Sequence, residues 1–150
     1  MRIFSAIALF VLLASFTPGT NTWGTNFDKA KQQAAAEHKF IVLNFSGSDW
    51  CGPCIRLHKE ILDSDAFLSY ADKNLVLVNA DFPRQKKNQL AKAQQQQNDK
   101  LADRYNDKGN FPLTVLLNAD GKLLKEWEGY PKMSIDEFIA DIKNTVDANK

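Results

Sequence analysis

Trp50-Cys51-Gly52-Pro53-Cys54 contains both cysteines of this 150-residue chain. It follows an apolar run, Phe40-Ile-Val-Leu-Asn-Phe45, which predicts a strand buried on both faces. Apolar residues at helical spacing continue from Ile55 to Leu62. The sequence therefore predicts strand, loop and helix, with the cysteine pair on the first helical turn, where a disulfide is feasible.

The start of the helix gives the two cysteines different chemistry. Unpaired N–H groups and the positive end of the helix dipole favour an anion, so we expect the pKa of the Cys51 thiol to fall and its reactivity to rise. Cys54 lies one turn further and is expected to be the buried, resolving thiol. Pro53 suits the first turn because it has no N–H, and Trp50 can shield one side of the pair.

This pentapeptide, between a strand and a helix, resembles the active site of the thioredoxin superfamily. The preceding Asn44-Phe-Ser-Gly-Ser-Asp49 resembles secreted members, whose loop is one residue longer than in cytosolic thioredoxins. The resemblance covers residues 25–148. It implies an α/β thioredoxin fold, a central mixed β-sheet of about four strands flanked by helices. It marks Cys51 and Cys54 as catalytic, in an environment made by Trp50, Gly52, Pro53, Asn44 and Asp49.

A second element of the expected site is Asn110-Phe111-Pro112. In the family, a cis-proline at this place faces the cysteine pair, and the residue before it offers its backbone to an extended substrate. The resemblance therefore implies a cis bond before Pro112 and a substrate-pairing role for Phe111. Gly129, after the last expected strand, should come near the same surface.

The sequence departs from the family at the proton-transfer position. Many thioredoxins have a buried aspartate where this chain has Asn44, and a lysine where it has Leu77. Asparagine cannot ionise, so proton transfer at Cys54 would need water or another carboxylate. Asp49 and Glu60 are the candidates, although both also fit plain surface charges. We expect Asn44 to hold backbone or water by hydrogen bonds.

The remaining pattern predicts the rest of one domain. Strands are expected at 40–45, 75–80, 113–117 and 122–128, with a turn at 118–121. Helices are expected at 27–39, 51–62, 63–70 and 85–100, and after a capping box that starts at 134. Inward positions on the first helix are Phe27, Ala30, Ala34 and Ala35. The Gln-rich 85–100 segment is expected to be one solvated helix with the sparse apolar face Leu90, Ala93, Leu101 and Tyr105.

The N-terminus predicts a signal peptide over residues 1–19. Arg2 precedes an apolar run from Ile3 to Phe16 that is short for a bilayer span, and Thr17-Pro-Gly-Thr20 breaks it. Periplasmic or secreted localisation follows. An uncleaved anchor or a buried first helix is the alternative.

Charge gives no case for nucleic acid or an anionic membrane as a partner, because 19 Lys and Arg balance 18 Asp and Glu. The leading hypothesis is an exported thiol–disulfide oxidoreductase that reduces protein disulfides through Cys51 and Cys54. The Gly-Pro between the cysteines resembles reducing members. We expect no cofactor beyond the redox-active pair, a monomer, and a membrane electron-donor protein that recharges it.

Three alternatives stay open. The enzyme could work in the opposite direction, as a disulfide oxidase or isomerase. It could be a non-enzymatic binding protein whose cysteines form a structural disulfide. Cys51, Cys54 and His58 could also belong to a metal site, but they lack a fourth ligand, and His38 has no sequence reason to be near. We expect no metal, and His58 as an ordinary helix-face residue.

Overall fold

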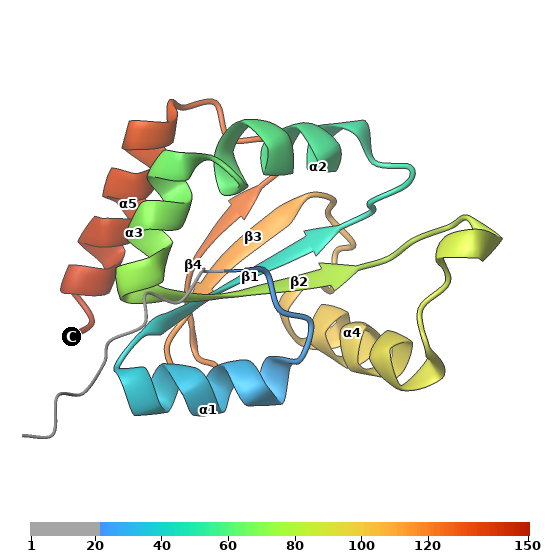
Figure 1. Ribbon diagram of the computed structural model, residues 1–150, viewed down its shortest axis with the longest axis horizontal. Coiled ribbons are helices and arrows are strands. Elements are labelled where there is room, and N and C mark those ends of the chain that lie inside the picture. The colour runs from blue at the N-terminus through green and yellow to red at the C-terminus, as the bar shows by residue number, and fades with distance from the viewer. Residues whose placement is uncertain (1–21) are drawn as a thin grey trace, which may run out of the picture.

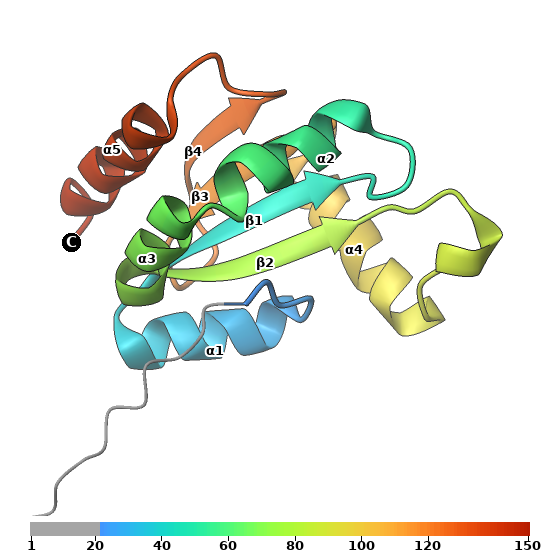
Figure 2. The same ribbon diagram turned by 45° about the horizontal axis from the view of Figure 1, so that its top comes forward.

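A computed structural model describes residues 22–150 as one four-stranded sheet with helices on both faces (Figures 1 and 2). The strand order is β2-β1-β3-β4. β1 and β2 are parallel, whereas the β1–β3 and β3–β4 pairs are antiparallel. The bounds are Phe40–Ser46 for β1, Leu75–Asp81 for β2, Leu113–Leu117 for β3 and Leu123–Glu128 for β4. The predicted mixed sheet is confirmed.

The helices form two layers, one on each side of the sheet (Figure 1). α1 (Phe27–Glu37) and α4 (Lys92–Tyr105) cover one face. α2 (Gly52–Leu57), which continues into the π-helix η1 (His58–Leu62), covers the other face together with α3 (Asp65–Asn74) and α5 (Ile135–Asp147). Side chains alternate across each strand, so β1 contributes to both cores. This arrangement is the thioredoxin fold predicted from the sequence.

The sheet face under α2 and η1 changes from apolar to polar toward the carboxyl end of β1. Asn44 lies in register with Asn79 on β2 and Thr114 on β3, and Ser46 lies in register with Asp81. Residues in register point to the same side of a sheet. We call these five side chains the polar layer; it lies next to the loop that carries the cysteines.

Helix α1 begins and ends close to its predicted bounds. Asn26 caps its start, accepting a hydrogen bond from the Lys29 N–H, and His38 ends it in the left-handed conformation with φ 53°. Phe27, Ala30 and Ala34 are buried, as expected, but Ala35 is exposed, so that assignment was wrong. The reason is geometric: residue 35 lies about 100° around the helix from residue 34.

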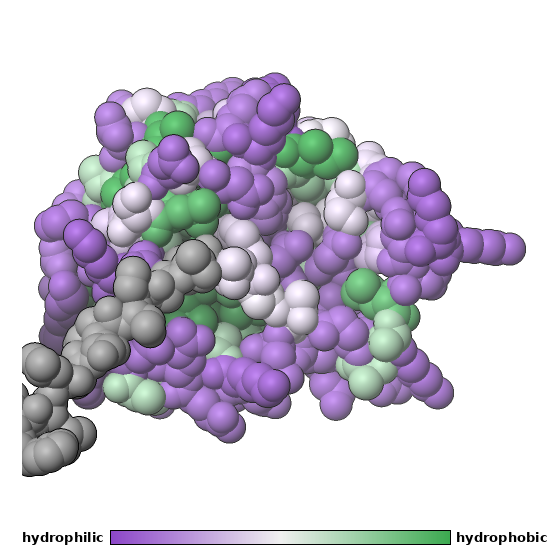
Figure 3. Space-filling view, in the orientation of Figure 1, coloured by the Kyte–Doolittle hydropathy of each residue, from purple (hydrophilic) through white to green (hydrophobic). Residues whose placement is uncertain are grey.

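The predicted single helix over 85–100 was also wrong. A short 3₁₀ turn at Lys86–Asn88 is followed by extended residues, and α4 begins only at Lys92. Ala93 is exposed and Leu90 half-buried, whereas Leu101 and Tyr105 are buried as predicted. In Figure 3 the 3₁₀ turn protrudes as a hydrophilic lobe on the right of the molecule.

The Gln-rich part of α4 is not simply solvated. The Gln94 and Gln97 side-chain amides both donate to the Thr25 carbonyl, at 2.9 and 2.7 Å. Gln97 also accepts the N–H of Phe27 at 3.2 Å. The glutamines therefore attach the segment before α1 to the body of the domain.

The predicted signal peptide, residues 1–19, lies outside the described residues. Within residues 22–150, no helix has both the length and the apolar character needed to cross a membrane.

Candidate active site

The two cysteines form a disulfide at the start of α2. Their Cα atoms are 5.3 Å apart, within the usual range for a disulfide. Cys51 is the N-cap, and its Sγ accepts the N–H of Cys54 at 3.2 Å. Cys51 is 4% exposed and Cys54 1%, so both sulfurs are nearly covered by protein. Gly52 and Pro53 between them are exposed.

Trp50 lies in an aromatic cluster beside the disulfide. Its Nε1–H donates to the Phe82 carbonyl at 2.8 Å, and its ring meets the Phe111 ring edge-on at 5.4 Å. The Arg84 guanidinium stacks on the indole, 3.6 Å from its centroid. Gly47 makes room for the ring, since an added Cβ there would lie 2.3 Å from Trp50 Cε2. The sequence predicted that Trp50 lies beside the cysteines, but it did not indicate that Gly47 makes room for the ring.

Phe111, Pro112 and Gly129 come together, as the resemblance implied. The Phe111–Pro112 peptide bond is cis, as predicted. Gly129 has φ +71° and donates its N–H to the Pro112 carbonyl at 2.8 Å. The contact of Phe111 with Trp50 places this loop beside the cysteine pair.

Asp49 attaches the loop after β2 to the cysteine loop. Its carboxylate accepts the N–H groups of Arg84 and Gln85 and the side-chain amide of Asn88, each at 2.9 Å. The Arg84 N–H and, next, the Asn88 amide lower the pKa of Asp49. We call this arrangement the Asp49 clamp. The Asp49 carboxylate is therefore occupied in holding the loop after β2 and not in proton transfer at Cys54.

Glu60, the other carboxylate considered for proton transfer, is also engaged elsewhere. It accepts the Tyr130 hydroxyl at 2.6 Å and lies 3.5 Å from Arg56 Nε. The Tyr130 hydrogen bond, ahead of the charge of Arg56, lowers the pKa of Glu60. Within residues 22–150, the hydrogen bonds of these two carboxylates go to the loop after β2 and to Arg56 and Tyr130, not to the cysteines.

Asn44 is fully buried and makes the hydrogen bonds expected of it. Its Nδ2 donates to Thr114 Oγ1 at 2.9 Å and, more weakly, to the Leu113 carbonyl at 3.4 Å. Its Oδ1 lies 3.2 Å from Nε2 of His58. The expectation of an ordinary helix-face histidine was therefore wrong, because the first turn of η1 turns this ring toward the polar layer.

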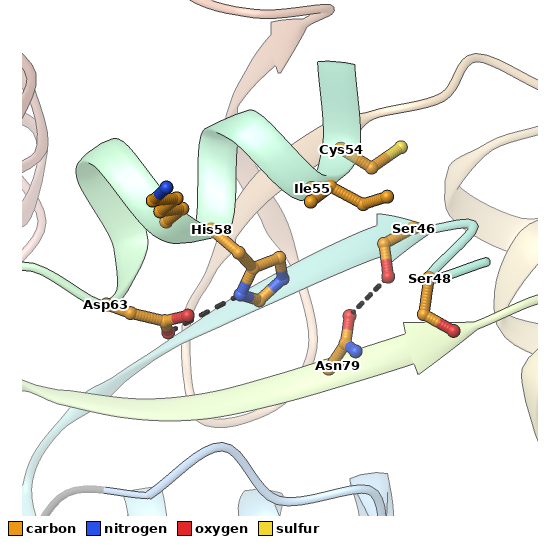
Figure 4. A pocket seen from close by; sticks show the side chains of 8 residues that line it. Ser46, Ser48, Cys54, Ile55, His58, Asp63 and Asn79 are labelled. Atoms are coloured by element: carbon orange, nitrogen blue, oxygen red, sulfur yellow. Dashed lines mark hydrogen bonds and ion pairs between the residues drawn. The ribbon is translucent and has the colours of Figure 1, made fainter. Parts of the chain in front are cut away.

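A cavity of about 500 Å³ lies between the helix and the sheet next to Cys54 (Figure 4). Cys54, Ile55 and His58 line it from the helix, whereas Ser46 and Asn79 line it from the sheet. Ser48, Lys59 and Asp63 complete its rim. The cavity joins the second cysteine to the histidine.

The metal alternative gains no support from residues 22–150, which contain no group of three His, Cys, Asp or Glu side chains placed to hold an ion. His38 lies at the far end of α1 from the cysteine loop, where it caps the helix.

Comparison with known proteins identifies the family. Residues 27–144 match the model of the thioredoxin-like domain family. The chain belongs to this family.

This thioredoxin-like protein is 38% identical over 121 residues to a Chlamydia pneumoniae protein named "Disulfide bond reductase DsbH", a match that covers 81% of this chain and 70% of that protein. A solved structure described as "DsbH Oxidoreductase" is 28% identical, with a TM-score of 0.77 over 97% of this chain and 95% of that one. A disulphide isomerase structure from Xylella fastidiosa Temecula1 is 26% identical, with a TM-score of 0.58, covering 77% of this chain and 87% of that one. The thioredoxin-like chain is accordingly a thiol–disulfide oxidoreductase.

Proposed function

We propose that this oxidoreductase is exported and reduces disulfides of other proteins, with Cys51 as nucleophile and Cys54 as resolving thiol. The observation that carries the assignment of roles is the N-cap position of Cys51, whose sulfur accepts the Cys54 N–H. The same N–H would stabilise a thiolate at Cys51 in the reduced enzyme. The likeness to DsbH, named a reductase, favours reduction.

The reaction proceeds in two exchanges. The Cys51 thiolate attacks one sulfur of a substrate disulfide, forming a mixed disulfide and releasing the first substrate thiolate. The Cys54 thiolate then attacks Cys51 Sγ, forms the Cys51–Cys54 bond and releases the second substrate thiolate. Two electrons pass from the cysteine pair to the substrate, and an electron-donor protein in the membrane restores the dithiol.

Phe111 and Pro112 are proposed to hold the substrate. Phe111 and Pro112 directly precede β3, and the Phe111 ring contacts Trp50 next to the cysteine pair. An extended polypeptide can pair with such a segment as an added strand, which brings its disulfide to Cys51. Gly129 supports the loop through its hydrogen bond to Pro112.

The reduction potential of the cysteine pair tests the direction. A value near about −270 mV, that of thioredoxin, is the expected result for a reductase. A value between about −180 and −120 mV would instead make the protein an isomerase or oxidase. A bond that resists reduction below about −300 mV would make the disulfide structural and contradict the proposal.

Variants of the two cysteines test the roles. Cys51→Ser should abolish turnover, because the attacking sulfur is gone, whereas Cys54→Ser should accumulate mixed disulfides that are never resolved. Mass spectrometry of the trapped adducts, and an insulin-reduction assay, measure the two effects. Full activity of Cys51→Ser would show that the nucleophile is assigned wrongly.

A further inference from the structure

Cys54 has to exchange a proton in each catalytic cycle. It must lose one before it attacks Cys51, and it must regain one whenever the disulfide is opened. Its side chain is 1% exposed, so bulk water has little direct access to the sulfur. Asn44 cannot ionise, and Asp49 and Glu60 are held by the loop after β2 and by Tyr130.

His58 is the imidazole that borders the same cavity as Cys54 (Figure 4). It lies one helical turn after Cys54, at the first position of η1. The Trp23 ring packs edge-on against the imidazole, with 5.0 Å between centroids. The histidine is thus fixed between the N-terminal segment, the helix and the sheet.

Both ring nitrogens of His58 face oxygen atoms. Asn44 donates from Nδ2 to Leu113 and Thr114, which turns its Oδ1 toward His58 Nε2 at 3.2 Å. Nδ1 faces Asp63 Oδ1 at 3.5 Å. A protonated imidazole can donate to both oxygens, whereas a neutral one can donate to only one. Asn44 and Asp63 thus fix the orientation of the imidazole through its two nitrogens.

The charged groups around the ring are Asp63 and Lys59, which lie on its own segment and line the cavity. The sheet side offers the neutral Ser46 and Asn79, whose side chains bond each other at 3.1 Å. Asp81 accepts hydrogen bonds from Ser46 and Ser48 at the edge of the polar layer. Asp63 is therefore the carboxylate paired with the ring.

We propose that His58 is the proton-relay residue of Cys54, exchanging a proton with its sulfur through the cavity. About 500 Å³ with several polar side chains is ample for water molecules that carry the proton. The inference rests on the proposed thiol–disulfide exchange and adds a residue to it.

When an incoming thiolate attacks Cys51 Sγ, the Cys51–Cys54 bond breaks, Cys54 leaves as a thiolate and takes a proton from the His58 imidazolium. When a mixed disulfide is resolved, the Cys54 thiol returns that proton to neutral His58. The resulting thiolate attacks Cys51 Sγ and releases the substrate thiolate. Asn44 and Asp63 position the imidazole in both directions.

The test separates the two chemical steps. In a Cys54→Ser background, formation of the mixed disulfide reports only on Cys51 and should be unchanged by His58→Ala. With Cys54 present, rapid-quench measurement of resolution should show His58→Ala slowed at least about tenfold near neutral pH, with a rate that rises as the pH is raised. Added imidazole, which fits the enlarged cavity, should restore the rate in His58→Ala and have no effect on the wild type.

Lys59→Gln is the matched control, because Lys59 borders the same cavity but has no assigned role; its resolution rate and pH profile should equal those of the wild type. A wild-type pH profile in His58→Ala, without imidazole rescue, would overturn the inference. Failure of mixed-disulfide formation in Cys54→Ser would instead overturn the proposed function.

A second measurement needs no variant of His58. The NMR signals of its imidazole, followed against pH, should titrate differently in the oxidised and reduced proteins, because a thiol replaces the disulfide across the cavity. Reduced Cys54→Ser, which lacks the Cys54 thiol, should titrate differently from the reduced wild type. Identical titrations in the oxidised and reduced proteins would also overturn the inference.

Discussion

Gly47 controls the position of Trp50 because it has no side chain. The indole occupies the space where a Cβ would be, and its Nε1–H reaches the Phe82 carbonyl from there. Trp50 in turn contacts Phe111 of the cis-proline loop. One missing methyl group thus lets the cysteine loop and the proposed substrate loop touch.

We predict that Gly47→Ala displaces the Trp50 ring. An added Cβ would overlap the indole, so the hydrogen bond to Phe82 should be lost, at a cost of about 1–3 kcal/mol in the free energy of unfolding. The Nε1–H resonance of Trp50 should shift, and mixed-disulfide formation should slow. Gly52→Ala is the control for the Trp50 resonance and for stability, since a Cβ there meets nothing within 4 Å. An unmoved Trp50 resonance in Gly47→Ala would contradict the prediction.

At the scale of residues, the sequence identified the functional groups that a short motif defines. The cysteine pair is readable from its spacing and its place between a strand and a helix, whereas the role of Pro112 was implied by the resemblance to thioredoxins. His58 was misjudged because its hydrogen bond to Asn44 spans 14 residues and depends on how η1 packs on β1. Trp23 was missed for the same reason, since its contact with His58 joins segments distant in the chain.

At the scale of elements, the helix with the cysteines does not keep one geometry. It changes from α to π at His58, and the Asp63 N–H donates to the His58 carbonyl at 2.8 Å, five residues back. Apolar spacing cannot distinguish this wider turn from an α-turn, because the inward residues remain Leu57, Ile61 and Leu62. The change in geometry occurs at the proposed relay residue.

The 84–88 loop shows why the predicted 85–100 helix failed. Helix propensity is a local quantity, whereas the start of this segment is set by a carboxylate 35 residues earlier. Asp49 takes up the N–H groups of Arg84 and Gln85, and the chain turns there before α4 begins.

We predict that Asp49→Ala releases this loop. Trypsin should then cut after Arg84, Lys86 or Lys87 several-fold faster at neutral pH, because the clamp no longer holds their backbone. Asp107→Ala, which removes another exposed carboxylate, should leave the rate unchanged. Equal cleavage of Asp49→Ala and wild type would show that the clamp does not restrain the loop.

The hydrogen bonds of the Asp49 clamp should also weaken when the pH is lowered. Its hydrogen bonds lower the pKa of Asp49 below the unfolded value of about 3.9. Their contribution is therefore complete above that value and is lost as the pH falls through the lowered pKa. The amide resonances of Arg84 and Gln85 should follow this titration in the wild type and lose it in Asp49→Ala; resonances that do not move below pH 4 would contradict the assignment.

At the scale of the whole molecule, the sheet has one uniformly apolar face and one divided face. The face toward α1 and α4 is built from apolar side chains, to which β1 contributes Ile41, Leu43 and Phe45. The face toward α2 is apolar at one end and carries the polar layer at the other. The apolar run of β1 could be read from the sequence, but Asn44 and Ser46 acquire partners only when β2 and β3 lie beside them.

The segment before α1 also bears on the solution behaviour of the whole molecule. Gly24 donates its N–H to the Leu77 carbonyl and accepts the N–H of Asn79, both at 2.9 Å, and forms a bridge to Val78. β2 is the outermost strand on that side of the sheet. An uncovered edge strand can template the pairing of a second chain, and these few residues occupy part of that edge.

The place at which the predicted signal peptide would be cleaved therefore matters for self-association. A chain that starts at Thr20 keeps the segment before α1, with Gly24, beside β2. A chain that starts at Asn26 leaves the edge of β2 uncovered and removes the Trp23 ring from His58. We expect the longer chain to stay monodisperse in sedimentation and the shorter one to aggregate on concentration, with faster exchange of the Asn79 amide. Equal behaviour of the two would mean that β2 needs no cover. Otherwise, if the predicted signal peptide is removed, the cleavage position would also determine whether the remaining chain stays monodisperse.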